Sequence, residues 1–119
     1  MASTQAKAKR KGAEFEVAVM EYLRGNGFDS AERLARAGRN DEGDVFVMDG
    51  HPTILECKAE ARLDLSGYLR ELEAERRHYA DARGLPVEDV TGLVVIKRRG
   101  VPIGKSYLVT TLEHYFAVD

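Results

Sequence analysis

Apolar residues recur along the chain with helical spacing in two long segments. In the first, one stripe is formed by Phe15, Val19, Tyr22 and Leu23. This spacing predicts a helix over residues 12–24, ended by the Gly25-Asn26-Gly27 sequence. The residues before this helix are small and polar without periodicity, so we expect residues 1–10 to form a flexible basic arm.

The second helical segment is longer, and we expect it to cover residues 65–83. Its stripe is formed by Leu65, Leu69, Leu72, Arg76, Tyr79 and Arg83. Asp64 or Ser66 can cap its start, and Gly84 followed by Pro86 ends it. Charged residues dominate the opposite face, which we expect to be solvated. They are Glu71, Glu73, Glu75 and Arg77.

Shorter apolar runs predict strands. A hairpin spans residues 44–58, a β-branched run covers 93–96, and a last strand covers 106–110 before Thr111 caps a short helix. The segment before the hairpin is ambiguous, because its residues favour a helix while the hairpin needs a neighbouring strand. There we choose a short strand over residues 31–35.

The hairpin is apolar on both faces. Val45, Val47, Leu55 and Cys57 share one face, and Phe46, Met48 and Ile54 share the other. A sheet with two apolar faces must be covered on both sides. We therefore interpret the order of helix, three strands, helix, two strands and helix as an α/β fold. It would have a mixed sheet of about five strands flanked by helices, in a single domain over residues 11–119.

The turn of the hairpin decides which side chains meet. The Asp49-Gly50 pair is a strong turn signal. A two-residue loop would leave Asp44 and Glu56 on opposite faces, since a shift of one residue turns every side chain over. A three-residue loop over residues 49–51, which we predict, sets the two acids directly opposite each other. Lys58 shares the face of Glu56, about 7 Å away along the strand.

Two facing carboxylates repel each other and destabilise a strand pair unless a cation lies between them. Mg²⁺ or Mn²⁺ is the natural neutralising ion for oxygen ligands. Lys58 can orient a water molecule or balance an anionic substrate, so the group suits phosphodiester hydrolysis. The motif is short, however, and by itself Glu56 with Lys58 also fits an ordinary edge-strand pair, with Asp44 as a turn cap.

A further acid lies on the first helix. At about 100° per residue, Glu16 falls at the edge of the apolar stripe, whereas Glu14 points away from it. Glu16 can therefore reach a site at the margin of the core. Taken alone, its position also suits a solvated residue on the flank of the helix.

Composition narrows the functional class. No apolar run reaches the roughly 18 residues that a membrane helix needs, and nothing resembles a signal peptide, so we expect no membrane partner. The single cysteine, Cys57, excludes an internal disulfide and fits a reducing cytoplasm. The three histidines are scattered without zinc-site spacing.

The formal net charge of −2 argues mildly against a general nucleic-acid coat protein, but the basic residues are clustered. The clusters are Lys7, Lys9, Arg10 and Lys11, then Arg33, Arg36 and Arg39, then Lys97, Arg98 and Arg99. Clusters that share a face with the acids would contact phosphate groups. A solvated surface explains any one cluster equally well.

Together, the ordered motifs resemble the PD-(D/E)xK nuclease superfamily, and within it the archaeal-type Holliday junction resolvases, including compact viral forms. The matching motifs are Lys11-Gly12-Ala13-Glu14-Phe15-Glu16, Gly27-Phe28, Arg36-Ala37-Gly38, Asp44 and Glu56-Cys57-Lys58. They lie between residue 9 and about residue 60. Gly43 replaces the proline of the motif, and Cys57 replaces a larger apolar residue.

The resemblance implies a restriction-endonuclease-like three-layer fold and an endonuclease that uses Mg²⁺, with Mn²⁺ able to substitute. Glu16, Asp44 and Glu56 would hold the metal, and Lys58 would position the attacking water. A homodimer would resolve four-way DNA junctions by paired symmetric nicks, in the cytoplasm of a microbe or of a virus-infected cell. Basic residues near the site would contact the DNA, namely Lys9, Arg10, Lys11, Arg33, Arg36 and Arg39.

Other functions fit parts of the pattern. A nuclease of the same superfamily acting on flap, repair or duplex DNA would use the same acids. A non-catalytic dimer that binds DNA junctions would keep the fold, but clustered carboxylates repel phosphate and would not serve it. A protein-interaction module with an acidic pocket fits the net charge but leaves the basic arm without a role.

Overall fold

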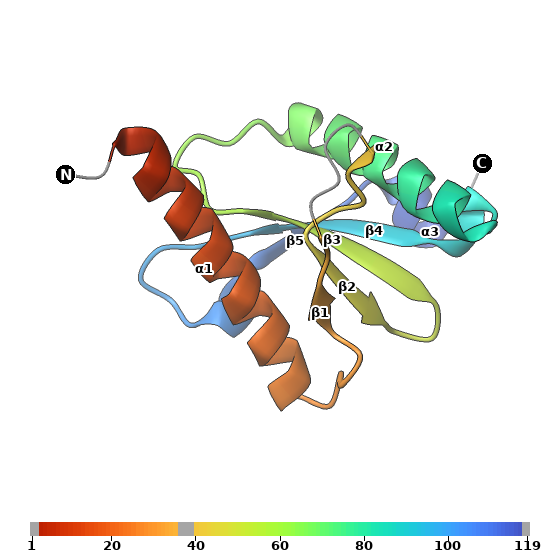
Figure 1. Ribbon diagram of the computed structural model, residues 1–119, viewed down its shortest axis with the longest axis horizontal. Coiled ribbons are helices and arrows are strands. Elements are labelled where there is room, and N and C mark those ends of the chain that lie inside the picture. Colours follow the sequence, from red (N-terminus) through yellow and green to blue (C-terminus); the bar gives the residue numbers. More distant parts are fainter. Residues whose placement is uncertain (1–2, 36–39, 118–119) are drawn as a thin grey trace.

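The computed structural model describes residues 3–35 and 40–117. In these ranges the chain forms one five-stranded sheet and three α-helices (Figure 1). The strands are β1 (Glu32–Arg33), β2 (Val45–Met48), β3 (Pro52–Lys58), β4 (Thr91–Ile96) and β5 (Tyr107–Val109). The helices are α1 (Thr4–Gly25), α2 (Leu65–Arg83) and α3 (Leu112–Phe116), with the 3-10 helices η2 (Val87–Asp89) and η3 (Ile103–Lys105). The predicted order of elements is confirmed.

The sheet is mixed, and its strands lie in sequence order from β1 to β5. Only the β3–β4 pair is parallel among the strands described, while the pairs on either side are antiparallel. A parallel pair needs a long crossover, and α2 provides it. The crossover places α2 on one face of the two central strands.

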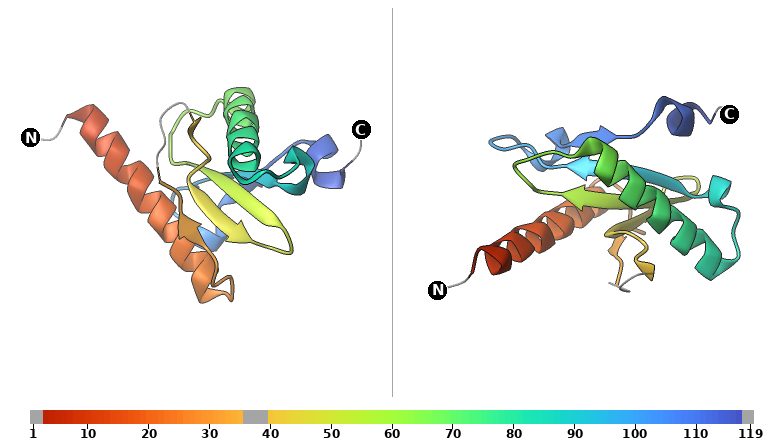
Figure 2. Two further views of the ribbon diagram at one scale, coloured as in Figure 1. Left: turned by 45° about the vertical axis from the view of Figure 1, so that its right-hand side comes forward. Right: turned by 90° about the horizontal axis from the view of Figure 1, so that it is seen from above.

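Neighbouring residues of β3 belong to different cores. Ile54 packs with α2 residues such as Leu72 and Tyr79, whereas Leu55 packs with Phe15 and Val19 of α1. Because successive strand residues point to opposite faces, α1 and α2 cover opposite sides of the sheet. Figure 2 shows the sheet between the two helices. The predicted α/β fold with a sheet flanked by helices is confirmed.

The register of the β2–β3 hairpin is the one predicted for a three-residue loop. Met48 pairs with Pro52, and the ladder continues to Val45 opposite Leu55. It stops one residue short of Asp44, whose backbone N–H donates to the Leu55 carbonyl at 3.0 Å. Gly43 precedes it with φ at 106°, a value that side chains disfavour. Asp44 therefore lies at the entrance of β2, and the expected strand pairing of Asp44 with Glu56 is not formed.

Helix α1 begins earlier than predicted. Ser3 caps it by accepting a hydrogen bond from the backbone N–H of Ala6 at 3.1 Å. Residues 4–11 are therefore helical, and they are exposed. The expectation of an unstructured arm is wrong for residues 4–10, because alanine, lysine, glutamine and arginine favour helices. In the predicted buried stripe, Tyr22 is 42% exposed.

Helix α2 has the predicted bounds. Asp64 caps its start by accepting from Gly67 N–H at 3.0 Å, and Gly84 ends it with φ at 66°. Its buried stripe is rotated from the one expected, and consists of Tyr68, Leu72, Glu75, Arg76, Tyr79 and Ala80. Leu65 and Arg83 are exposed instead. The expectation that the glutamate-rich face is solvated is wrong for Glu75.

The predicted C-terminal elements are also present. β5 and α3 follow one another, and the Thr111 hydroxyl caps α3 by accepting from His114 N–H at 3.1 Å. β1 is a strand as predicted, although it has only two residues. Within residues 3–35 and 40–117, no helix combines the length and apolar character needed to cross a membrane.

Candidate active site

Glu56 is a carboxyl group buried in the centre of the sheet. It lies on β3 on the side covered by α2, and it is 4% exposed. Its Oε2 atom has no hydrogen-bond partner among the described residues. Burial, opposed in part by the adjoining Asp44, raises the pKa of Glu56 to about 8. A carboxyl in this position favours either a proton or a nearby cation.

Asp44 adjoins Glu56 from the entrance of β2. Its Oδ2 accepts a hydrogen bond from the backbone N–H of Cys57 at 2.8 Å, and its carboxyl interacts directly with that of Glu56. The bond to β3 fixes the Asp44 side chain beside the strand although the backbone ladder has ended. The two acids singled out in the sequence are therefore brought together.

Lys58 lies on the same face of β3 as Glu56. Its Nζ is 3.9 Å from Glu56 Oε1, and it is 3.0 and 3.1 Å from the two carboxylate oxygens of Glu71 on α2. It also lies over the ring of Tyr68, 5.0 Å from the centroid. Side chains of α2 thus hold the Lys58 ammonium beside the carboxylate of Glu56.

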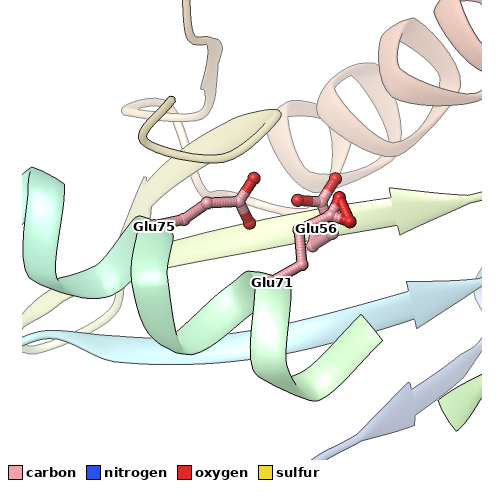
Figure 3. A group of neighbouring side chains, drawn as sticks. All are labelled: Glu56, Glu71 and Glu75. Carbon is pink, nitrogen blue, oxygen red and sulfur yellow. The ribbon is translucent and has the colours of Figure 1, made fainter. Parts of the chain in front are cut away.

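Two further acids complete the group, and sequence analysis did not assign them to it. Oxygens of Glu56, Glu71 and Glu75 lie within 4.8 Å of one another, and the three side chains converge between β3 and α2 (Figure 3). Glu75 is 3% exposed, and its Oε1 has no hydrogen-bond partner in the described chain. Burial, reinforced by the charges of Asp41, Glu71 and Asp44, raises the pKa of Glu75 to about 7.

A signal for Glu75 is present in the sequence. It stands three residues after Leu72 and four before Tyr79, which is the spacing of one helical face. Both neighbours are buried, so a glutamate between them is buried too. The predicted stripe passes through Leu65 and Leu69 instead, and this choice turns Glu75 outward.

Glu16 lies on the other side of the sheet. It is 5% exposed on α1, and its Oε1 accepts a hydrogen bond from Arg33 Nη2 at 3.1 Å. The prediction that Glu16 faces inward and Glu14 outward is confirmed, since Glu14 is exposed. The structure does not bring Glu16 into the group of Glu56, Glu71 and Glu75.

Cys57 separates the acids of the two faces. Burial, and then the charges of Asp44, Glu16 and Glu56, raise the pKa of the Cys57 thiol. The Cys57 side chain belongs to the core beneath α1, so it lies on the face of β3 opposite to Glu56. A role for Glu16 as a direct metal ligand stays a prediction, and in this structure its carboxylate forms an ion pair with Arg33.

The basic residues are distributed unevenly around this site. Lys9, Arg10 and Lys11 are exposed along α1, and Arg36 and Arg39 lie outside the described residues. Lys11 lines one hollow together with Lys97, Arg98 and Arg99, beside Ala59 and Glu60 at the end of β3. Two basic clusters that are far apart in the sequence therefore meet next to the strand that bears Lys58.

The donor atoms of this group suit a hard divalent cation. Its members are carboxylate oxygens, which Mg²⁺ and Mn²⁺ prefer, and at least one of them is buried without a partner in the described chain. Comparison with protein-family models and with curated proteins gave no match. Functional inference for this chain therefore depends on its own residues.

Proposed function

We propose that the protein is a metal-dependent endodeoxyribonuclease of the PD-(D/E)xK type that resolves four-way DNA junctions. The observation that supports it most directly is the contact of the buried Glu56 with Asp44, with the Lys58 ammonium 3.9 Å from Glu56. A hard cation held by carboxylates, with a lysine beside it, is a combination that can catalyse the hydrolysis of a phosphodiester.

Each residue has a definite task in this proposal. Asp44 and Glu56 would hold Mg²⁺, or Mn²⁺ in its place, and Lys58 would orient the attacking water toward phosphorus. When bound, the cation supplies Lewis-acid stabilisation of the phosphate and of the leaving 3′ oxygen. By the resemblance, Glu16 would complete the ligands of the metal or support them, and in this structure its carboxylate accepts a hydrogen bond from Arg33 Nη2 at 3.1 Å.

The preference for a four-way junction comes from the resemblance of the motifs, and the charge distribution is compatible with it. The basic hollow beside β3 offers phosphate contacts that do not depend on sequence. A homodimer would present two sites to a junction with near two-fold symmetry. We place this activity in the cytoplasm of a microbe or of a virus-infected cell, since the lone cysteine suits a reducing compartment.

The test is incubation of the purified protein with a labelled immobile four-way junction and with linear duplex, each with Mg²⁺ and with EDTA. Paired symmetric nicks in the junction, formed only with metal, are the expected result. Metal-dependent cutting of both substrates would move the assignment to a general nuclease. Tight junction binding without any cutting would contradict a catalytic role.

Variants separate chemistry from binding in the same assay. Lys58→Ala and Asp44→Asn should abolish cleavage while junction affinity stays close to that of the wild type. Lys105→Ala, an exposed residue of η3, is the matched control and should cleave normally. Equal activity in Lys58→Ala and the control would refute the role of Lys58.

A further inference from the structure

Two buried oxygen atoms in the cluster of Glu56, Glu71 and Glu75 form no hydrogen bond within the described residues. Glu56 Oε2 and Glu75 Oε1 are buried, and neither has a hydrogen-bond partner in the described parts of the chain. Their carboxyl groups interact directly with each other. Two acids buried face to face are unfavourable unless a positively charged species or a proton joins them.

The spacing of the group suits a metal ion. Mg²⁺ bonds oxygens at about 2.0 to 2.1 Å and Ca²⁺ at about 2.3 to 2.6 Å, so two ligand oxygens of one ion lie at most about 4.2 Å apart for Mg²⁺ and about 5.2 Å apart for Ca²⁺. The oxygens of Glu56, Glu71 and Glu75 lie within 4.8 Å of one another. Figure 3 shows them approaching from β3 and from two successive turns of α2.

One positive group, the ammonium of Lys58, already lies beside these carboxylates. Its ammonium bonds both oxygens of Glu71 and lies 3.9 Å from Glu56 Oε1. In this structure the ammonium neutralises Glu71, so a cation bound by Glu56, Glu71 and Glu75 would take over one Glu71 oxygen from Lys58. Glu56 Oε2 and Glu75 Oε1 have no hydrogen-bond partner in the described chain and are open to that cation.

We propose that Glu75 and Glu71 of α2, together with Glu56, bind a hard divalent cation. Asp44 is not one of these three ligands, and it adjoins Glu56 from the entrance of β2. Glu56 would therefore contribute to two cation positions, one with Glu71 and Glu75 and the other with Asp44. The inference deepens the proposed function and rests on it for the catalytic use of the ion. Cation binding itself is measurable without any cleavage.

The experiment is a titration of the full chain with Mn²⁺, with free Mn²⁺ followed by electron paramagnetic resonance. Glu75→Gln and Glu71→Gln should each weaken Mn²⁺ binding by about tenfold or more, as loss of a metal-supporting residue does. Glu88→Gln removes an exposed glutamate of η2 and should bind as the wild type does.

Unchanged Mn²⁺ binding in both α2 variants would overturn the inference, and the Asp44 position and the nuclease proposal would be unaffected. Absence of Mn²⁺ binding by the wild type would also overturn it, and junction cleavage would then judge the nuclease proposal separately. Glu71 is 46% exposed in its side chain, so Glu71→Gln should fold. That variant decides the question even if Glu75→Gln is unstable.

Discussion

At the scale of single residues, the burial of Glu56 and Glu75 makes the stability of the fold depend on pH. Their pKa values are raised from 4.5 to about 8 and about 7. Between pH 4.5 and the raised values, Glu56 and Glu75 therefore keep their protons in the folded protein, whereas the same carboxyls are ionised in the unfolded chain. Without metal, the free energy of unfolding should fall as pH rises from about 4.5 to about 8, and then level off.

Urea denaturation in EDTA at pH 5 and at pH 8.5 measures this effect. The loss should be on the order of a few kcal/mol, because each tenfold difference in proton affinity between the folded and unfolded chains corresponds to about 1.4 kcal/mol. Glu75→Gln should flatten the dependence, because it removes one of the two titrating carboxyls. A stability that rises over this range in the wild type would contradict the assignment of both groups.

Cys57 gives a second prediction at this scale. Its side chain is buried in the core beneath α1, and burial together with three nearby carboxylates raises its pKa. The thiolate is the reactive form of cysteine. The native protein at pH 8 should therefore resist iodoacetamide for hours, and the urea-unfolded chain should be alkylated within minutes. Mass spectrometry gives the readout, and rapid labelling of the native chain would show that this part of β3 opens.

At the scale of elements, the contact of α2 with β4 depends on the small size of Gly92. A methyl group there would lie 2.7 Å from Arg76 Cδ and 3.0 Å from Leu72 Cδ1. Arg76 cannot easily move, because its Nε donates to the Val90 carbonyl at 2.9 Å. Gly92→Ala should therefore lower the free energy of unfolding by about 1 to 3 kcal/mol.

Gly12 provides the matched control for this substitution. It lies within α1, and a methyl group there would have nothing within 4 Å. Gly12→Ala should stabilise the protein by roughly 0.5 to 1 kcal/mol, since alanine favours helices. Chemical denaturation of both variants gives the comparison. Equal effects would mean that the packing of α2 on β4 tolerates more volume than the structure indicates.

The elements also show what sequence can and cannot predict here. The bounds of α2 follow from local chemistry, because Asp64 caps its start and Gly84 adopts the left-handed conformation at its end. The hairpin register follows from alternation of apolar residues. The rotation of α2 about its own axis is not set by local sequence, because it depends on which side chains fit against β4. The burial of Glu75 escapes prediction for this reason.

The same distinction applies to the candidate site. Asp44, Glu56 and Lys58 could be placed together from the spacing of one hairpin, and the structure brings them together. The pairing of Lys58 with Glu71 joins residues 13 positions apart in the chain, across the connection to α2. Such a contact depends on tertiary packing, which no local pattern specifies.

At the scale of the whole molecule, apolar side chains are exposed on β5, which is the edge strand opposite β1, and on the helix α3 that follows it. They are Leu108 of β5, which is 64% exposed, and Leu112, Tyr115 and Phe116 of α3, which are 78%, 70% and 64% exposed. β5 has a partner strand on one side only in the sheet described. A free edge beside exposed apolar side chains is a typical site of self-association.

If the protein is a homodimer, this surface should form its interface. Leu112→Glu places a charge at the most exposed of these residues and should weaken dimerisation by on the order of tenfold or more. Sedimentation equilibrium measures it, with circular dichroism to establish that the fold is intact. Leu63→Glu changes an apolar residue of similar type, 52% exposed, in the connection before α2, and should leave the dimer unchanged. A wild-type protein that remains monomeric at high concentration would contradict the dimer, and equal weakening by both variants would place the interface elsewhere.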